Sequence, residues 1–472
     1  MQKITITNFG AIKYAEIEIR KILVLIGKQA SGKSTIAKLI YFFKSLKDDL
    51  FTQIYHDTQK DYFDTDSDLI SPIRDKFYNF FGSTFYLPDF EIKFHYSIKE
   101  DKFLKLSIDE NKRLTTNFSP NFLNDNFIIS ASNIKRLIQQ LLNVNNIRRK
   151  QLQLFDEEEK IRYAQQLSIL LNVLFESHQN NALFIIAGRN ATVSYSDLFE
   201  KYLFASVQRT LEENTKQSFK RKEQTIEEIL MLKFMVNVEA IKDAFKKFEN
   251  FEGLIESYEE KESARQKLHI IKNNINKILK GEYRIDNLGE KIVFNEGTEE
   301  YVYLSNASSG QQESIRILQD VFINILYNYK ILRILEEPEA HLFPIAQKQL
   351  IELLALMVNH NDDNQLIITT HSPYILTVFN NLLFANRVVK KNPSAESEVT
   401  EIIPKDCWLD ACDFSAYSLG NESILEEKDY CESIFNNEKG TIKQNYLDTV
   451  SEILGDDFQA LYNIHAKTFA RK

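Results

Sequence analysis

The eight residues from Gly27 to Ser34 constrain this chain more than any other part of its sequence. They follow the pattern of a glycine, four residues and then Gly-Lys-Ser without a mismatch. An apolar, β-branched run at residues 22–26 comes before them and indicates a buried strand. Apolar residues at helical spacing follow from Ile36 to Phe43. A strand, a glycine loop and a helix in this order predict a phosphate-binding loop.

Each residue type in this loop has a chemical reason. Glycines at 27 and 32 allow backbone angles and close approaches that a Cβ would block. Backbone N–H groups from Lys28 to Lys33 can turn around a phosphate, helped by the positive end of the following helix. We expect Lys33 to bridge the β- and γ-phosphates of a nucleotide and the Ser34 hydroxyl to bind Mg²⁺. The candidate phosphate-binding residues are Gly27, Lys28, Ala30, Ser31, Gly32, Lys33, Ser34 and Thr35.

Two further apolar runs end in polar residues that suit the same site. Residues 331–335 lead into Glu336 and Glu337, and residues 366–370 lead into His371. A helical stretch separates the two runs, so they fit a parallel strand–helix–strand unit. The carboxyl ends of parallel strands share one edge of a sheet, where acids can hold a metal and polarise water. We therefore expect Glu336 to bind Mg²⁺, Glu337 to activate the attacking water, and His371 to hydrogen-bond a γ-phosphate.

The stretch Ser308-Ser309-Gly310-Gln311 opens a predicted helix, and serine and glycine there are suitable helix caps. A capped helix N-terminus attracts anions. Taken alone, such a stretch most often does no more than begin a helix.

Alternating patterns indicate antiparallel strands in three places: in the first twenty residues around Asn8-Phe9-Gly10, between residues 94 and 108, and as a hairpin around residues 283–304. The pattern predicts polar helices in residues 133–180 and 205–280, with a short buried strand near residue 183 between them. The apolar stripe from Ile241 to Leu254 lasts under three heptads, so it predicts local packing and no long coiled coil.

Composition limits the class of protein. The chain is 43% hydrophobic and 26% charged, as in soluble globular proteins, and its 472 residues suggest two or three lobes. We expect a cytoplasmic protein, because no apolar run approaches membrane-spanning length and the first ten residues lack a signal pattern. The three cysteines lack paired spacing and indicate free thiols. The net charge of −9 does not favour nucleic acid, and for the basic runs at 148–150 and 216–222 we favour a solvated helix face over a DNA contact.

The phosphate-binding loop, the stretch at 308–311, and the ends of the two apolar runs at Glu336-Glu337 and His371 together resemble the ABC-type ATPases in content and order. Residues 27–34 match Walker A, 308–311 the signature motif and 332–337 Walker B, while His371 matches the switch histidine. Glu339-Ala340-His341-Leu342 falls where the D-loop belongs. The sequences around Glu336-Glu337-Pro338 and His371-Ser372-Pro373, with the opening residues 4–12, are similar to the AAA-15/AAA-21 group of OLD-like ATPases.

The resemblance implies an α/β fold, an ABC-type ATPase head whose mixed sheet holds the phosphate-loop βαβ core and an antiparallel β subdomain, with an inserted helical lobe. The expected parts are residues 1–130 and 283–395 for the head, 131–282 for the lobe, and 396–472 for a C-terminal helical extension. In that family two chains enclose two ATP molecules, so Ser308, Ser309, Gly310 and Gln311 are expected to face the partner's nucleotide. The family's Q-loop glutamine has no clear counterpart, and we take Arg189 as its substitute. Ser309 replaces the first signature glycine and Glu336 stands where Asp is frequent, so hydrolysis can be slow.

The family resemblance favours an ATP-driven sensor or scaffold in bacterial antiphage defence, similar to the ATPase subunits of Septu, PARIS and certain retron systems. Its expected partners are a second copy of itself in a homodimer or higher oligomer and a separately encoded effector such as a nuclease; a nucleic acid is a further candidate, a membrane is not. No nuclease domain is expected within the chain, because no strand-bound Glu followed by Asp-x-Asp comes after His371. The alternatives are an SMC-like DNA-repair ATPase, which should carry sustained heptads, and a transporter nucleotide-binding subunit, which is usually about half this length.

Overall fold

The computed structural model describes residues 1–56, 62–147, 153–179, 181–194, 225–258, 262–294, 300–420, 430–443 and 458–462. A central six-stranded sheet runs through the molecule in the order β14-β13-β3-β12-β11-β7. Five of its strands are parallel and β14 is antiparallel to its neighbour. The strands are β3 (Ile22–Gly27), β7 (Asn181–Ile185), β11 (Ile331–Glu336), β12 (Gln365–Thr370), β13 (Phe414–Leu419) and β14 (Cys431–Ser433).

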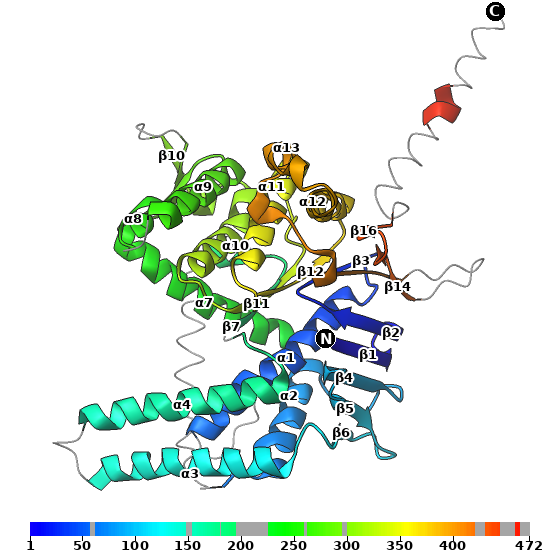
Figure 1. The fold of residues 1–472 in the computed structure, drawn as a ribbon, viewed down its shortest axis with the longest axis vertical. Helices are drawn as coiled ribbons and strands as arrows, with labels where there is room; N and C mark the ends of the chain where they lie inside the picture. The colour runs from blue at the N-terminus through cyan, green and yellow to red at the C-terminus, as the bar shows by residue number, and fades with distance from the viewer. Residues whose placement is uncertain are drawn as a thin grey trace, which may run out of the picture.

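Both faces of this sheet are buried, as expected for parallel strands. In β3, Ile22 and Val24 belong to one hydrophobic core, while Leu23 and Leu25 belong to the other. Helices cover the first face, and α1 with an antiparallel sheet covers the second (Figure 1). The helices are α1 (Lys33–His56) on the second face and α7 (Ile226–Phe248), α8 (Phe251–Glu256), α9 (Glu262–Leu279), α10 (Ser309–Leu326), α11 (Pro344–His360) and α12 (Pro373–Lys391) on the first.

The antiparallel sheet has the order β2-β1-β4-β5-β6, and it contains the two N-terminal sets of strands that the alternation predicted. An aromatic cluster on α2, with Phe77 and Phe80 buried, packs between this sheet and α1. The strands are β1 (Gln2–Phe9), β2 (Ile12–Ile19), β4 (Glu91–Ser97), β5 (Lys102–Ile108) and β6 (Leu114–Phe118), and a π-helical turn (Asp66–Ile70) leads into α2 (Ser71–Phe81).

The expected helical insertion is divided by a strand. Helices α3 (Asp125–Ile147) and α4 (Gln153–Phe175) form an antiparallel pair that extends from the head (Figure 1). The chain then returns to the central sheet as β7 before the short α5 (Ala191–Ser194) and α7 to α9. The predicted hairpin near residue 290 has a third strand: β8 (Glu282–Asp286), β9 (Gly289–Val293) and β10 (Tyr301–Tyr303) form one antiparallel sheet. The two basic runs, 148–150 and 216–222, lie outside the described residues.

The segment after residue 395 corrects the expectation of a helical extension. Its described residues include the helix α13 (Glu396–Ile402), a short helical stretch at 458–462, and β13, which lies beside β3 in the central sheet. All six residues of β13 are buried, although two of them are serines. Its sequence therefore shows neither the apolar run nor the alternation that would predict a strand. The buried Ser415 hydroxyl donates a hydrogen bond to the Glu18 carbonyl at 2.9 Å. Two short strands follow, β15 (Phe435–Asn436) and β16 (Thr441–Ile442), and 3₁₀ turns lie at Leu304–Asn306, Pro393–Ala395, Lys405–Cys407 and Ala411–Asp413.

Candidate active site

The loop between β3 and α1 has the backbone that its glycines allow. Gly27 has a φ of +154°, and a Cβ there would stand 2.3 Å from the Leu419 carbonyl oxygen on β13. Gly32 has a φ of +79°, and a Cβ there would stand 2.8 Å from Ile12. Ala30 also adopts a positive φ, of 60°, at the exposed tip of the loop. The glycines are therefore required by packing as well as by the turn.

Lys33 begins α1 and points back into the loop. Its ammonium donates to the carbonyls of Gly27 at 2.9 Å and Lys28 at 2.8 Å, and it lies 3.4 Å from Ser31 Oγ. Burial lowers the pKa of Lys33, while the nearby carboxylates of Glu337 and Glu339 act in the opposite direction. The cation therefore lies among the loop's backbone groups with two acids close to it, and a phosphate oxygen is the ligand such a cation favours.

Strand register brings the metal candidates to the same edge. Glu336 pairs with Thr369 of β12, and Thr369 pairs with Leu25 of β3. Glu336 therefore lies two strand spacings, roughly 10 Å, from Leu25 on β3, the strand that leads into the phosphate loop. Glu336 is 8% exposed and its Oε1 is buried without a hydrogen-bond partner, while Ser34 is exposed at the start of α1.

This donor set fits Mg²⁺, which commonly takes one or two carboxylates together with substrate phosphates. Within the described part of the chain, no group of three or more His, Cys, Asp or Glu side chains could hold a metal by itself. The orphaned Oε1 of Glu336 is the observation that favours a cation here.

Glu337 and His371, predicted from two separate strands, meet in the structure. His371 Nε2 lies 3.4 Å from Glu337 Oε1, and both side chains are partly exposed at the edge of the sheet. Glu337 has a φ of +44°, which is unusual for a residue other than glycine. Its N–H donates to the Thr369 carbonyl at 2.9 Å, so β12 helps to hold this conformation.

Glu339 is a site residue that the sequence analysis placed only in the D-loop. Its Oε1 accepts hydrogen bonds from Thr370 Oγ1 at 2.6 Å and from the backbone N–H of His371 at 2.9 Å. It therefore fixes the turn on which the histidine stands. The spacing of a third acid two residues after Glu337 is the signal that could have found it.

The signature stretch begins α10 with a reciprocal cap. Ser308 Oγ accepts from the Gln311 N–H, and Gln311 Oε1 accepts from the Ser308 N–H at 3.0 Å. Ser308 and Ser309 are exposed, and a Cβ on Gly310 would stand 2.7 Å from the carbonyl oxygen of His341 in the D-loop. Helix α10 itself packs against α7, α9 and α11.

Arg189 does not occupy the place of a Q-loop residue. Its side chain is fully buried and donates to backbone carbonyls, including those of Glu336 at 2.7 Å and Glu337 at 3.0 Å. It also forms an ion pair with Glu313 of α10 at 3.2 Å. The expectation that it substitutes for the glutamine is wrong, because a guanidinium saturated in this way cannot also face a nucleotide.

The C-terminal strands also contact the loop, which the sequence analysis missed. Tyr430, next to β14, donates its hydroxyl hydrogen to the Ser31 carbonyl at 2.8 Å. A Cβ on Gly420, just after β13, would stand 2.9 Å from the Ser31 Cβ. The phosphate loop is thus supported by residues almost four hundred positions away.

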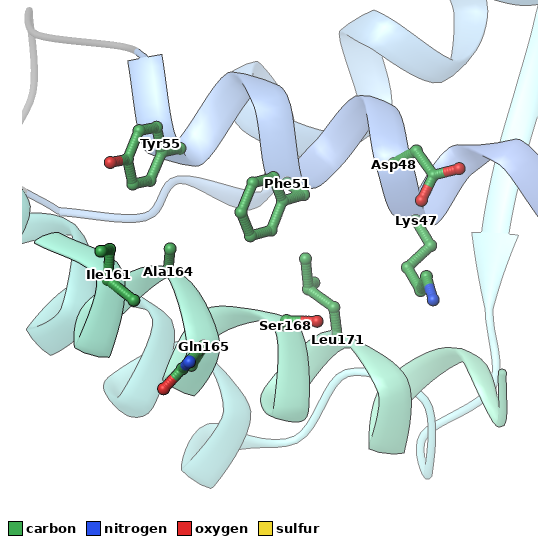
Figure 2. Close-up of a pocket in the computed structure, with 9 residues that line it drawn as sticks. All are labelled: Lys47, Asp48, Phe51, Tyr55, Ile161, Ala164, Gln165, Ser168 and Leu171. Atoms are coloured by element: carbon green, nitrogen blue, oxygen red, sulfur yellow. The ribbon is translucent and has the colours of Figure 1, made fainter. Parts of the chain in front are cut away.

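A separate cavity of about 400 Å³ lies between α1 and α4, away from the loop (Figure 2). Lys47, Asp48, Phe51 and Tyr55 line it from α1, and Ile161, Ala164, Gln165, Ser168 and Leu171 line it from α4. Lys47 Nζ donates to Asn172 Oδ1 at 2.9 Å and to the Ser177 carbonyl at 3.1 Å, and burial raises the pKa of Asp48 to about 6. Lys47 is fourteen residues from Lys33, roughly 20 Å along the helix, so the cavity is no part of the candidate site.

No helix among the described residues is both long enough and apolar enough to cross a bilayer. Comparison with curated proteins found no match. Among solved structures, the chain is similar to an SMC head bound to the C-winged helix domain of ScpA, with 13% identity over 80% of this chain and 90% of that chain and a TM-score of 0.34. It is also similar to the SMC head domain from Thermotoga maritima, with 11% identity, the same coverage and a TM-score of 0.31.

A third structure, an Smc head domain with an extended coiled coil bound to a ScpA domain from Pyrococcus furiosus, has 14% identity over 80% and 92% of the two chains and a TM-score of 0.32. TM-scores and identities this low indicate nothing about what the chain does. The family comparison is more informative, because AAA_15, described as an AAA ATPase domain, matches residues 1–376. This match spans well over half of the chain and includes the phosphate loop, both acids at the end of β11 and the histidine after β12, so the protein belongs to the AAA ATPase domain family.

Proposed function

We infer that this chain binds and hydrolyses ATP, and that two copies close around the nucleotide to control a separate effector in antiphage defence. The observation that carries the hydrolytic part is the meeting of Glu337 and His371, 3.4 Å apart, at the sheet edge that also presents Lys33. Acid, histidine and buried lysine come from three different strands or their following turns, and no packing requirement brings these residue types together.

The chain's own groups can carry the reaction as follows. The loop N–H groups and Lys33 bind the β- and γ-phosphates, and Ser34 with Glu336 would hold Mg²⁺, which neutralises phosphate charge when bound. Water attacks the γ-phosphorus, the bond to the bridging oxygen breaks, and ADP and phosphate form. Glu337 accepts the proton of the water, and His371 holds Glu337 and the γ-phosphate in place.

The exposed start of α10 supports the dimer. Ser308 and Ser309 stand at a helix N-terminus, where N–H groups and the helix dipole attract phosphate. Gly310 packs against the D-loop of its own chain, so this end of α10 contacts the turn that follows the Walker B segment. An exposed anion site at this position fits the phosphate of a nucleotide held by a second copy.

The defence role rests on the resemblance to the ATPase subunits of Septu, PARIS and retron systems, and it is tested in the native host. Cells in which Lys33→Ala replaces the natural chain should lose protection against at least one phage in a plating assay. Tagged Glu337→Gln protein should co-purify with a nuclease or a nucleic acid, whereas tagged Lys33→Ala protein should not. Full protection by Lys33→Ala would overturn the role in defence. Co-purification of a membrane permease would favour the alternative hypothesis of a transporter nucleotide-binding subunit.

The SMC-like alternative predicts a different outcome of the same experiment. Such a protein would bind chromosomal DNA in uninfected cells and would not affect plating. The helical pair offers little support for it, because α3 and α4 each have 23 residues, which is roughly 35 Å of helix.

A further inference from the structure

Arg189 lies where the pairing between β7 and β11 stops. The two strands pair as far as Ile185 opposite Leu335. Beyond that point Arg189 takes the place of the missing strand: Nη1 donates to the Glu336 carbonyl at 2.7 Å and Nη2 donates to the Glu337 carbonyl at 3.0 Å. The side chain is fully buried, and the bond to the Glu336 carbonyl is buried while the bond to the Glu337 carbonyl is partly buried.

The bond to Glu337 bears on a strained residue. A non-glycine residue with a φ near +44° persists only where its surroundings hold it, because this conformation is strained. The Glu337 N–H is held by Thr369 of β12, and its carbonyl is held by Arg189. The direction of the Glu337 side chain, which faces His371, follows from this backbone conformation.

Arg189 also joins the same corner to the signature helix. Its Nε lies 3.2 Å from Glu313 Oε2 and donates to the Glu313 carbonyl at 3.2 Å, and its backbone N–H donates to Glu313 Oε2 at 3.0 Å. Glu313 is buried and lies three residues after Gly310 on α10. One planar guanidinium therefore bonds to both the signature helix and the backbone of the predicted hydrolytic acid.

We propose that Arg189 is a positioning residue that couples the signature helix to hydrolysis by holding Glu337 in its left-handed conformation. This proposal rests on the hydrolytic role given to Glu337 above. A shift of the α10 N-terminus, such as engagement of a second chain's nucleotide, is transmitted through Glu313 and Arg189 to the Glu337 carbonyl. The rate of hydrolysis then responds to dimer closure even when ATP is already bound.

The molecule contains a matched control for this arginine. Arg333 is equally buried, pairs with Asp320 of α10 at 2.6 Å and donates to the Asn181 carbonyl of β7 at 2.9 Å. It therefore ties together the same three elements, β7, β11 and α10, seven residues further along the helix. No hydrogen bond joins its guanidinium to Glu336 or Glu337 in the described structure.

The test compares Arg189→Lys with Arg333→Lys in the full chain. Lysine keeps the charge and loses the planar fork, so both variants should lower the melting temperature. Arg189→Lys should lower kcat for ATP hydrolysis by about 10- to 100-fold, as expected when a reacting group is misplaced, and leave the Kd for ATP within about threefold. At an equal loss of melting temperature, Arg333→Lys should lower kcat at least several-fold less than Arg189→Lys, because its guanidinium does not bond to the Glu337 carbonyl. Equal kcat losses in the two variants, or a wild-type kcat in Arg189→Lys, would overturn the proposal.

A milder pair decides the matter if Arg189→Lys does not fold. Glu313→Gln and Asp320→Asn each remove one buried charge and keep an acceptor oxygen. Glu313→Gln should lower kcat several-fold more than Asp320→Asn at equal loss of melting temperature, and equal kcat values contradict the coupling. Wild-type protein that fails to hydrolyse ATP, or Glu337→Gln protein that hydrolyses it normally, would refute the proposed function itself. If the wild-type protein hydrolyses ATP and Glu337→Gln does not, but Arg189→Lys keeps the wild-type kcat, only the role of Arg189 is refuted.

Discussion

The two halves of the candidate site differ in how they are held. At the phosphate-loop edge, several groups are tied to others within the chain: Lys33 to loop carbonyls, His371 to Glu337 and Glu339, and the loop itself to Tyr430. At the start of α10, the exposed Ser308 bonds to the half-buried Gln311 in a cap, and the Gln311 amide also donates to the Leu279 carbonyl. The first region is built to hold a ligand, and the second is built to present a surface.

This difference shows why a single chain need not be a complete enzyme. On the proposed function, a nucleotide bound at the loop edge would meet the lysine, the metal ligands and the hydrolytic acid of its own chain. Its remaining face would be open to the signature end of another copy. Removing groups from one half at a time shows whether the other half keeps its function.

Lys33→Ala should have the largest effect. The change removes the buried cation that pairs with the phosphates, and loss of such a charged partner typically costs about 2–5 kcal/mol, roughly 30-fold to several thousand-fold in affinity. Isothermal titration with ATP and Mg²⁺ should show no binding in the micromolar range, while the melting temperature stays close to wild type. Tight binding by the variant would mean that the loop edge does not hold the phosphates.

Glu337→Gln should separate binding from chemistry within that same edge. The amide cannot accept the proton of the attacking water, and general-base catalysis typically contributes 10²–10⁴-fold. Phosphate release should fall by at least about 100-fold at saturating ATP, with the Kd for ATP unchanged. Hydrolysis at the wild-type rate would show that another group activates the water.

Glu336→Gln should have a smaller effect that depends on the metal. A unit charge near a protein surface attracts another at 4 Å by roughly 4 kcal/mol, so loss of the carboxylate weakens Mg²⁺ binding. The Mg²⁺ concentration for half-maximal hydrolysis should rise by about tenfold or more, and kcat should recover at high Mg²⁺. An unchanged Mg²⁺ dependence would remove Glu336 from the metal site.

Tyr430→Phe should have the smallest effect on the loop edge. It deletes one hydrogen bond to the Ser31 carbonyl, worth about 1 kcal/mol. The Kd for ATP should rise by a few-fold, and ATP-dependent association should weaken only in proportion. A stronger loss of association than of ATP binding would place Tyr430 at the dimer surface, which contradicts its assignment to the loop.

Sequence patterns predicted the parts whose chemistry is local. The strand–loop–helix around Lys33, the parallel order of β11 and β12, and the cap at Ser308 follow from short-range spacing. The same reasoning anticipated that Glu337 and His371 share an edge, because both follow strands of one βαβ unit.

Long-range contacts were not predictable in this way. Strand β13 has serines at two buried positions, and its place beside β3 depends on hydrogen bonds to residues about four hundred positions away. Arg189 was interpreted as a ligand-facing residue because it follows a strand. Its burial depends on Glu313, whose contact with it joins positions 124 residues apart. Spacing along the chain carries no information about such pairs.

The central claim is that the exposed start of α10 completes the site of a second copy. The most direct measurement is the mass of the Glu337→Gln protein in solution, with and without ATP and Mg²⁺, compared with Glu337→Gln carrying Ser308→Arg in addition. The 55.2 kDa chain should at least double its mass when ATP is added, and the double variant should bind ATP equally well without any increase. An ATP-dependent increase that survives Ser308→Arg, or no increase in Glu337→Gln, would contradict the account.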